Sequence, residues 1–327
     1  MATGEQIKAL IKAHFENSSD RFATTALQVA AHEARQGHDT LAEQIRDIVQ
    51  KSKPTSPNVS VIQFKREISD LIVCNNSENR LTDLIVPDPV KNRLKRILTE
   101  FKQQEKLRKF GLKNRRKILI TGPPGTGKTL TASVLAGELH LPLMVVMMDK
   151  LLTKFMGETS ARLRQIFDTI QDNMGVYLFD EFDTIGADRA YDNDVGEMRR
   201  VLNSFLMFIE QDNSSSIIIA ATNNVRMLDQ ALFRRFDDVL QYERPTDTDI
   251  EHLIKNRVSS FIPASGLPQN LIIEAKGLSH AEIVQACDDA LKDAVLQDKI
   301  SISPDFLIHS VQEKKNAYDR VWGIDRG

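Results

Sequence analysis

The sequence predicts an α/β protein, in which a parallel β-sheet flanked by helices is preceded by a small helical module and followed by a second helical segment. Between about residues 81 and 243, short apolar runs alternate with stretches of helical periodicity, a pattern typical of a parallel sheet covered by helices. The runs that we expect to form buried strands are residues 117–120, 143–147, 176–179, 217–221 and 239–242. After Arg244-Pro245 the pattern becomes helical again and continues to about residue 318.

The first 52 residues predict a separate helical module. Residues 5–50 contain three amphipathic stretches, of which the second ends at Gly37 and the third is capped by Asp39 and Thr40. Residues 53–58, which include two prolines, break this pattern as a linker does. The expected parts are a helical module at 1–52, a linker and connecting segment at 53–80, the α/β domain at 81–243 and a helical domain at 244–327.

Composition favours a cytoplasmic protein without a membrane partner. The 327 residues carry 43 basic and 45 acidic side chains, and a net charge of −2 gives no global signature of nucleic-acid binding. Cys74 and Cys287 are far apart in the sequence, which favours free thiols in a reducing compartment. The N-terminus lacks the apolar core of a signal peptide, and the longest apolar run, residues 217–221, is too short to cross a bilayer.

One motif indicates a bound nucleotide. The sequence Gly122-Pro123-Pro124-Gly125-Thr126-Gly127-Lys128-Thr129 lies between a predicted strand and a predicted helix, the context of a phosphate-binding loop of the P-loop NTPase type. Its glycines let backbone N–H groups turn around an anion, and the helix N-terminus adds a positive dipole. Lys128 would reach the β- and γ-phosphates, and Thr129 would hold Mg²⁺. The predicted nucleotide-binding residues of this segment are Pro124, Gly125, Thr126, Gly127, Lys128, Thr129 and Leu130.

Two further strand ends carry polar side chains. The third predicted strand is followed by Asp180 and Glu181, and the fourth by Thr222 and Asn223, and residues at such strand ends lie beside the phosphates in an open parallel sheet. Asp180 would hold Mg²⁺ together with Thr129, and Glu181 would orient and activate the attacking water. Asn223 would hydrogen-bond the water and the γ-phosphate. The alternatives are a loop that begins with two acids and a turn-forming asparagine.

These motifs, in this order, resemble the AAA family of ATPases. The resemblance covers roughly residues 81–300 and includes a fourth motif, Leu228-Asp229-Gln230-Ala231-Leu232-Phe233-Arg234-Arg235-Phe236-Asp237. It implies that the cofactors are ATP and Mg²⁺ and that residues 244–327 form a helical lid domain. It also implies that Lys128, Glu181 and Asn223 are catalytic.

The fourth motif is similar to the segment whose arginines reach the γ-phosphate of a neighbouring subunit in that family. The resemblance therefore implies that Arg234 and Arg235 are arginine fingers acting in trans; a solvent-exposed basic pair is the alternative. The motif is shorter here than the family's pattern and lacks the glycine between the arginines. Which of the two reaches the phosphate stays open, with Arg235 favoured.

A site completed from outside requires a neighbour, and a head-to-tail contact closes into a ring; the resemblance implies six subunits. The segment Lys154-Phe155-Met156-Gly157-Glu158 resembles the pore loop with which such rings grip extended polypeptide. Phe155 would wedge against the substrate, and Met156 would supply an adaptable neighbour. The alternative is an ordinary core helix, which Gly157 disfavours. Residues 187–196 are a candidate second pore element.

Residues 277–283 resemble the start of the lid helix that covers adenine in AAA proteins. On this basis His280, Ala281, Ile85 and Ile254 are expected to line the base. Many relatives outside the AAA clade proper place an arginine near this point, where the chain has Ala281. This difference favours the protein-remodelling clade.

The predicted function is a ring-forming AAA ATPase that hydrolyses ATP to remodel, unfold or thread protein substrates. One alternative, from a likeness to bacterial stand-alone AAA ATPases, is a regulatory ATPase that gates a partner protease of the subtilisin-like type. Another is a DNA-dependent ATPase, because residues 91–117 carry twelve positive residues. The aromatic residues in that stretch, Phe101 and Phe110, fit a helical core face. We therefore expect a solvated helix surface there and no nucleic-acid partner.

Overall fold

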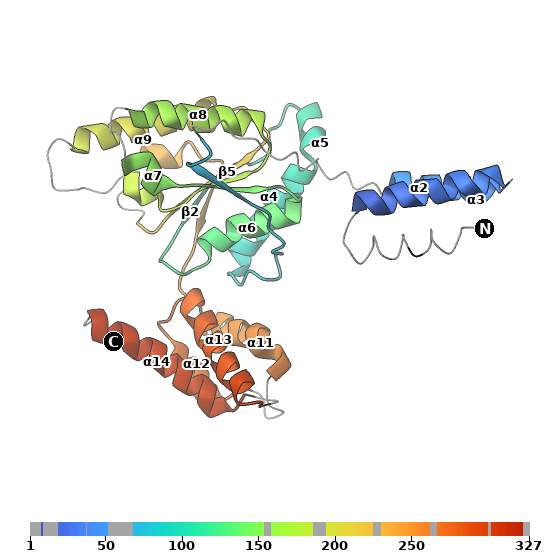
Figure 1. Cartoon of the computed structure of the whole chain (residues 1–327). Coiled ribbons are helices and arrows are strands. Elements are labelled where there is room, and N and C mark those ends of the chain that lie inside the picture. The colour runs from blue at the N-terminus through green and yellow to red at the C-terminus, as the bar shows by residue number, and fades with distance from the viewer. Residues whose placement is uncertain are drawn as a thin grey trace. The chain divides into compact units, whose positions relative to one another are not determined.

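The computed structural model describes residues 8, 19–36, 38–51, 68–153, 158–185, 194–224, 230–261, 267–299 and 302–322. The chain divides into two compact units, Met1–Ile62 and Gln63–Gly327. In Figure 1 the described part of the first unit is blue, and that of the second runs from cyan to red. No helix within the described ranges has both the length and the apolar character needed to span a membrane.

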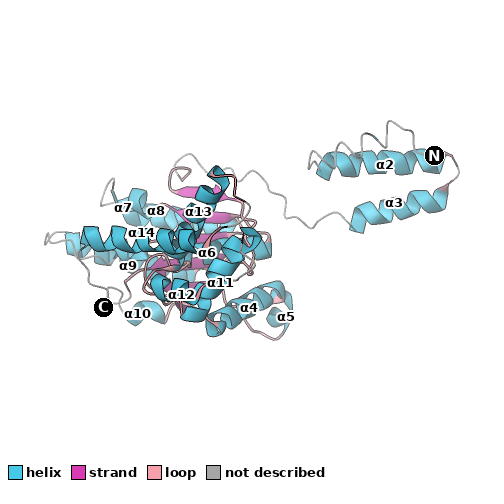
Figure 2. Ribbon diagram, turned by 90° about the horizontal axis from the view of Figure 1, so that it is seen from below, coloured by secondary structure: helices cyan, strands magenta, loops and turns pink. Residues whose placement is uncertain are grey.

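Two helices form the described part of the N-terminal unit. α2 (Ser19–Arg35) and α3 (Asp39–Lys51) lie side by side as a helical hairpin (Figure 2). Small side chains fill the contact, with Ala30 at 0% and Ala42 at 2% exposure, and the size of the contact residues sets how closely two helices approach. These are the second and third predicted helices; the first lies outside the described residues except for Lys8.

A six-stranded sheet forms the core of the second unit. Its strands are β1 (Ile72–Asn75), β2 (Lys117–Thr121), β3 (Leu143–Val146), β4 (Val176–Phe179), β5 (Ile217–Thr222) and β6 (Asp238–Gln241), in the order β1-β3-β4-β5-β2-β6. All neighbours pair in parallel except β1, which runs antiparallel to β3. The five predicted strands and the α/β fold class are thus confirmed, whereas β1 was not predicted.

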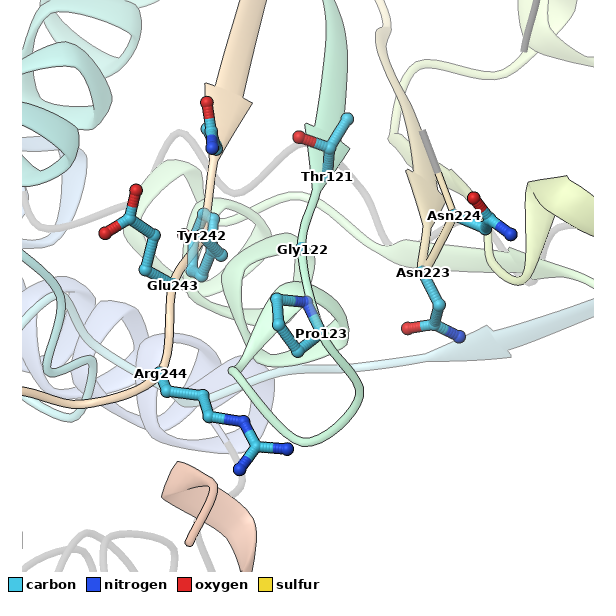
Figure 3. A pocket seen from close by; sticks show the side chains of 9 residues that line it. Thr121, Gly122, Pro123, Asn223, Asn224, Tyr242, Glu243 and Arg244 are labelled. Carbon is cyan, nitrogen blue, oxygen red and sulfur yellow. The ribbon is translucent and has the colours of Figure 1, made fainter. Parts of the chain in front are cut away.

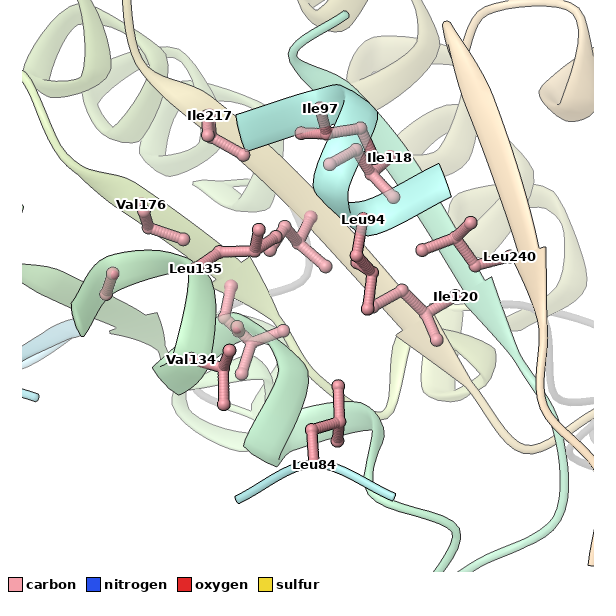
Figure 4. Packing of buried hydrophobic residues seen from close by; sticks show 14 of the residues in the cluster. Leu84, Leu94, Ile97, Ile118, Ile120, Val134, Leu135, Val176, Ile217 and Leu240 are labelled. Carbon is pink, nitrogen blue, oxygen red and sulfur yellow. The ribbon is translucent and has the colours of Figure 1, made fainter. Parts of the chain in front are cut away.

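Helices cover both faces of the sheet (Figure 1). On one face, α4 (Asp88–Lys102) and α6 (Lys128–Leu139) pack against alternate residues of the strands. Figure 4 shows this layer, in which Leu94 and Leu135 of the helices and Ile118 of β2 are fully buried. Because successive side chains of a strand point to opposite faces, the intervening strand residues are left for the second helical layer.

The second layer is rich in aromatic side chains. It is built from α8 (Thr159–Asp172) and α9 (Asp194–Gln211). Phe179 of β4 packs against Phe167 of α8 and Phe205 of α9, with ring centroids 6.0 and 5.1 Å apart. Burial on both faces explains why the central strands are continuous apolar runs rather than alternating ones. The short elements of this domain are α5 (Gln104–Lys109), α7 (Met148–Thr153), the 3-10 turn η2 (Phe182–Ile185) and α10 (Gln230–Phe233).

The last part of the chain is helical, as predicted. Its elements are α11 (Asp247–Val258), the 3-10 turn η4 (Ser259–Phe261), α12 (Gln269–Ala275), α13 (His280–Leu296) and α14 (Pro304–Trp322). They enclose a hydrophobic core of their own. Thr246 and Ser279 begin α11 and α13 with reciprocal capping boxes, which satisfy backbone N–H groups that the first turn leaves unpaired.

The segment before α4 is bound to the sheet domain, although the sequence predicts only a connecting segment there. β1 occupies the edge beside β3. Beyond it, Ser77 and Asn79 form 2.8 Å hydrogen bonds with the Ser133 hydroxyl of α6, and Arg80 donates to the carbonyl of Gly137 at 2.9 Å. β1 escaped prediction because it is only four residues long and, of those four, only Ile72 is buried.

Ion pairs within the chain engage part of the basic stretch at residues 91–117. The arginines of this stretch that pair with carboxylates are Arg93, Arg96, Arg108, Arg115 and Arg116. Phe101 is buried as expected, but the expectation for Phe110 is wrong, because its side chain is 76% exposed. The helical periodicity does not continue to Phe110, since α4 ends at Lys102 and a separate short helix follows.

Gly137 offers a test of how firmly the segment before α4 is held. A Cβ atom at this position would lie 2.2 Å from the carbonyl oxygen of Asn79. We expect Gly137→Ala to lower the free energy of unfolding by about 1–3 kcal/mol, because overpacking forces the backbone to shift. Alanine would otherwise stabilise a helix by about 1 kcal/mol relative to glycine.

Urea unfolding followed by circular dichroism measures the change. Leu296→Ala is the control, because the Leu296 side chain is 81% exposed and its removal should change stability by less than about 0.5 kcal/mol. Unchanged or increased stability of the Gly137→Ala protein would contradict the close contact with Asn79.

Candidate functional site

The carboxyl ends of three neighbouring strands meet at one edge of the sheet. β4, β5 and β2 are adjacent and parallel, so the residues that follow them lie along the same edge. β2 leads into the phosphate loop at residues 122–129, β4 into Asp180 and Glu181, and β5 into Asn223. The structure therefore brings together the predicted loop, the two predicted acids and the predicted asparagine.

Lys128 is the buried cation of the phosphate loop. Its side chain is only 6% exposed, and its Nζ atom donates to the carbonyl oxygens of Gly122 and Pro123 at 2.8 and 2.7 Å. Burial lowers the pKa of Lys128, while the charges of Asp180 and Asp183 raise it. An ammonium that is withdrawn from water and hydrogen-bonded to two neutral carbonyls is well suited to a phosphate oxygen, with which its hydrogen bonds are stronger.

Thr129 and Asp180 present two oxygen atoms to the same point. The Thr129 hydroxyl donates to Oδ2 of Asp180 at 2.5 Å. Hydroxyl and carboxylate oxygens are suitable ligands for Mg²⁺, so this pair fits the cation expected with a nucleoside triphosphate. Within the described residues, no group of three or more His, Cys, Asp and Glu side chains is placed to hold a metal ion. The remaining ligands of Mg²⁺ would therefore be phosphate oxygens and water.

Glu181 has an unusual backbone conformation. Its φ of 49° lies in the left-handed region, which is uncommon for residues other than glycine and concentrates at functional sites. Its N–H donates to Oδ1 of Asp180 at 2.9 Å, and its carbonyl accepts from the Thr184 N–H at 2.9 Å. These two bonds hold the turn, while the residue itself remains exposed. An exposed carboxylate next to an aspartate that is suited to bind Mg²⁺ can accept a proton from water.

Among the described residues, Asn223 is held through its backbone and not through its side chain. Its N–H donates to Oδ1 of Asp183 at 3.4 Å. The preceding residue, Thr222, accepts from the Gly122 N–H at 3.2 Å, which joins the end of β5 to the start of the phosphate loop. Asn223 is exposed, so its amide can reach a ligand in the loop.

A buried pair of hydroxyl groups supports the loop and was not predicted. The Thr131 hydroxyl donates to the carbonyl of Gly127 at 2.9 Å and lies 2.5 Å from the Tyr242 hydroxyl. Since the one hydroxyl hydrogen of Thr131 is used on Gly127, Tyr242 is the donor to Thr131. Burial raises the pKa of Tyr242 to about 12 and keeps this donor neutral. The sequence predicts only that Tyr242 belongs to a strand. Its hydrogen bond to Thr131 could not be predicted, because the two residues are 111 positions apart in the chain.

The first turn of α13 lies against the phosphate loop. The Ala281 N–H donates to the carbonyl of Gly125 at 3.0 Å. Gly125 has a φ of +72°, and a Cβ atom there would lie 2.5 Å from the Ser279 hydroxyl. Only glycine combines this backbone conformation with so close an approach. Of the predicted adenine-lining residues, Ala281 thus touches the loop directly.

The other predicted base-lining residues differ in accessibility. His280 is 8% exposed, and both of its ring nitrogens lack a hydrogen-bond partner within the described residues. Burial lowers the pKa of His280, so its ring is neutral at pH 7. Ile85 packs against the hydrophobic core of the C-terminal helices, in which Ile254 is fully buried. In this conformation Ile254 offers no surface to a base.

A pocket of about 440 Å³ opens beside the loop (Figure 3). Its lining residues follow β2, β5 and β6: Thr121, Gly122, Pro123, Asn223, Asn224, Gln241, Tyr242, Glu243 and Arg244. Figure 3 shows the side chains of Asn223 and Arg244 approaching the loop from opposite sides of Pro123.

Comparison with known proteins identifies the family to which this chain is related. Residues 118–244 match the family model described as ATPase family associated with various cellular activities (AAA). An uncharacterized AAA family ATPase of Sinorhizobium fredii, y4kL, is 31% identical over 302 residues, which cover 91% of this chain and 91% of that protein. The chain belongs to the AAA family of ATPases. As a member of that family it binds nucleotide and hydrolyses ATP.

Other relatives of this AAA ATPase are longer proteins. A putative 26S proteasome regulatory subunit homologue of Methanocaldococcus jannaschii is 30% identical over 217 residues, or 65% of this chain and 58% of that protein. The ATP-dependent zinc metalloprotease FtsH 2 of a Thermoanaerobacter species is 32% identical over 223 residues, or 66% of this chain and 42% of that protein. The chain thus matches about half the length of these two relatives.

The predicted arginine fingers of this AAA ATPase lie at the amino ends of the parallel strands. The phosphate loop lies at the opposite, carboxyl ends. Arg234 and Arg235 precede β6, and the nearby Asp237 N–H donates to the carbonyl of Lys117, the first residue of β2, at 2.8 Å. The loop follows the last residue of β2, so the length of the strand, about 16 Å at 3.3 Å per residue, separates the two. Arg235 pairs with Glu210 of α9.

Arg234 is exposed and forms no ion pair within the described ranges. Both arginines therefore lie on the surface, and Arg235 must leave Glu210 to contact another group. The predicted pore residues Phe155 and Met156 lie outside the described residues, as do residues 187–193 of the candidate second pore element.

Gly125 and Gly111 form a matched pair for testing the contact between the loop and α13. Both have a left-handed φ, +72° and +70°, but an added Cβ meets Ser279 at Gly125 and nothing within 4 Å at Gly111. Each alanine should cost about 1–2 kcal/mol of backbone strain.

Only Gly125→Ala should also raise the dissociation constant for ATP, by at least about tenfold, because the added methyl group displaces the loop. Titration calorimetry with ATP on both variants measures the effect. Equal ATP affinities for Gly125→Ala and Gly111→Ala would show that the contact with Ser279 does not shape the loop.

Proposed function

We propose that this AAA ATPase forms a ring of six subunits, binds ATP between neighbouring subunits, and uses its hydrolysis to remodel, unfold or thread protein substrates. Support comes from the separation of Arg234 and Arg235 from the phosphate loop of their own chain. Arginines at the opposite edge of the sheet serve a phosphate in a neighbouring subunit, where they stabilise the charge of the leaving phosphoryl group. Such a head-to-tail contact produces a ring when its rotation closes.

The site residues divide the chemistry of ATP hydrolysis among them. Lys128 leaves the carbonyls of Gly122 and Pro123 and binds the β- and γ-phosphates. Thr129 and Asp180 would hold Mg²⁺, which when bound would neutralise charge on the phosphate oxygens.

Glu181 accepts a proton from the attacking water and directs its oxygen at the γ-phosphorus. Asn223 orients the same water and the phosphate through its amide. The backbone turn at Glu181 keeps this carboxylate at the end of β4, beside Asp180.

The adenine base would lie near the start of α13, between the sheet domain and the lid. Ala281 already contacts the loop, and the unpartnered ring nitrogens of His280 can hydrogen-bond a base that reaches them. Ile85 packs against the lid core and would add apolar contact. Ile254 would contribute only after the lid shifts and uncovers it.

The proposed substrates are proteins. Two relatives of this chain carry names that concern proteolysis, a proteasome regulatory subunit homologue and a zinc metalloprotease. Phe155 and Met156 are the proposed pore residues, and the helical module at 1–52 would act as an adaptor. The composition supports a cytoplasmic setting.

The proposed boundaries of the ATPase parts, 81–243 for the large domain and 244–327 for the lid, are supported by a separate hydrophobic core in each. The segment at 53–80 connects them to the N-terminal module, and its second half carries β1. The division of the chain into two compact units falls inside this segment.

Mixing two inactive variants tests the proposed site between subunits. Arg234→Ala/Arg235→Ala retains the phosphate loop and Lys128→Ala retains the arginines, so each alone should lose at least about 99% of its turnover. In rings mixed in equal amounts, about a quarter of the interfaces pair an intact loop with intact arginines. ATP turnover should therefore reappear on mixing.

Each arginine variant alone then identifies the main finger. The sequence favours Arg235, whereas Arg234 is the arginine without an ion pair inside the described part of its own chain. Full turnover by a monomeric preparation, or by the double arginine variant, would contradict the proposal.

Phe155→Ala distinguishes remodelling from regulation of a partner. If the ring threads protein, an unfolded protein substrate should stimulate ATP turnover of the native protein, and Phe155→Ala should reduce that stimulation at least about tenfold without changing basal turnover. Steady-state turnover with and without the unfolded protein measures this. If the protein instead gates a partner protease, Phe155→Ala should have no effect, while Glu181→Gln should hold the partner in one state. Stimulation by duplex DNA at low salt would instead favour the DNA-dependent alternative.

A further inference from the structure

Arg244 lines the pocket beside the phosphate loop and has no role in the chemistry above. It is the third residue after β6, whose pairing with β2 continues beyond the strand, since the Tyr242 N–H donates to the carbonyl of Thr121 at 2.7 Å. The chain that carries Arg244 is thereby held beside the start of the loop. In Figure 3 its side chain extends beneath Pro123, toward the loop.

Arg244 has no charged partner in the part of the chain that the structure describes. Among the pocket-lining residues, all of which the structure describes, it alone is positively charged. The one acidic residue there, Glu243, points away from the loop in Figure 3. Within the described ranges Arg244 forms no ion pair, and its Nη1 atom donates to the carbonyl of Gly277, a neutral group. Arg93, Arg115 and Arg116, at the other edge of the sheet, each pair with a carboxylate.

The pocket shares two residues with the place where Lys128 is held. Gly122 and Pro123, whose carbonyls accept from Lys128, also line the pocket. An anion that draws Lys128 away from these carbonyls therefore lies next to Asn223 and Arg244. A guanidinium binds phosphate through charge-assisted, often bidentate hydrogen bonds, which are stronger than a bond to a neutral carbonyl.

We propose that Arg244 binds the terminal phosphate of ATP within its own subunit and gives up the carbonyl of Gly277 to do so. This rests on the proposed placement of the triphosphate in the loop at residues 122–129. Arg244 is then a nucleotide-binding residue that distinguishes ATP from ADP, because Asn223, the proposed γ-phosphate contact, shares its pocket.

The exchange also links the nucleotide to the lid. Gly277 lies shortly before α13, whose first turn contacts the phosphate loop through Ala281 and Gly125. While ATP is bound, Arg244 is engaged by phosphate and its hydrogen bond to the carbonyl of Gly277 is broken. When the γ-phosphate leaves, Arg244 returns to Gly277. Each hydrolysis event therefore changes a contact at the base of the lid helix.

Nucleotide binding to Arg244→Gln and Arg244→Lys tests the proposal. Both are measured by titration calorimetry with ATP and with ADP, in the Glu181→Gln background so that ATP is not consumed. Glutamine can still donate to Gly277 but carries no charge. Arg244→Gln should therefore raise the dissociation constant for ATP about tenfold or more, and that for ADP by less than about threefold. Arg244→Lys should fall between the native protein and Arg244→Gln, because it keeps the charge but loses the planar fork.

Arg96→Gln is the matched control, since Arg96 is an exposed arginine paired with Glu100 of its own helix. It should leave both affinities unchanged. Unchanged ATP affinity in Arg244→Gln, or an equal loss for ATP and ADP, would overturn the proposal. If Arg244→Gln does not fold, Arg244→Lys decides alone, and an ATP affinity equal to that of the native protein overturns the proposal.

Lys128→Ala separates this inference from the proposed site. If Lys128→Ala weakens ATP binding and Arg244→Gln does not, only the role of Arg244 fails. If Lys128→Ala leaves ATP binding intact, the placement of the triphosphate in the loop is itself wrong.

Discussion

Parallel pairing of β4, β5 and β2 is the constraint on which the rest of this structure depends. The register aligns Thr121 with Thr222 and Phe179 with Ala220, so the phosphate loop, the acidic pair and Asn223 leave the sheet side by side. β6 also pairs in parallel with β2, so Arg234 and Arg235, which precede β6, lie at the opposite ends of the strands from the phosphate loop. One topological rule thus brings most of the predicted site residues together and places Arg234 and Arg235 away from them.

Local interactions then prepare the loop for an anion. Lys128 is buried at the base of the loop, where two carbonyls satisfy its ammonium in the absence of phosphate. On the buried side, the Thr131 hydroxyl donates to the carbonyl of Gly127 and accepts from the Tyr242 hydroxyl. A preorganised cradle binds phosphate without first ordering its own backbone, which reduces the entropy lost on binding.

The loop is also a point of contact between the sheet domain and the C-terminal helical domain. The carbonyl of Gly125 accepts from Ala281 at the start of α13, and Arg244 donates to Gly277 just before it. Both contacts are single hydrogen bonds to neutral carbonyls, which contribute about 1 kcal/mol each. Interactions of this size are strong enough to bias the position of a lid and weak enough to be exchanged during each catalytic cycle.

The amino-acid sequence by itself determined the α/β class, five of the six strands, the phosphate loop and the acidic pair after β4. These features are local, because a buried strand, a glycine-rich loop and a capped helix each depend on residues close together in the chain. The tertiary structure alone decided the features that join distant segments. β1 joins the sheet with one buried residue, Tyr242 supports Thr131, and Arg244 reaches Gly277. Each of these contacts joins segments that are far apart in the sequence. Hydrophobic periodicity, which depends on neighbouring residues, therefore does not predict them.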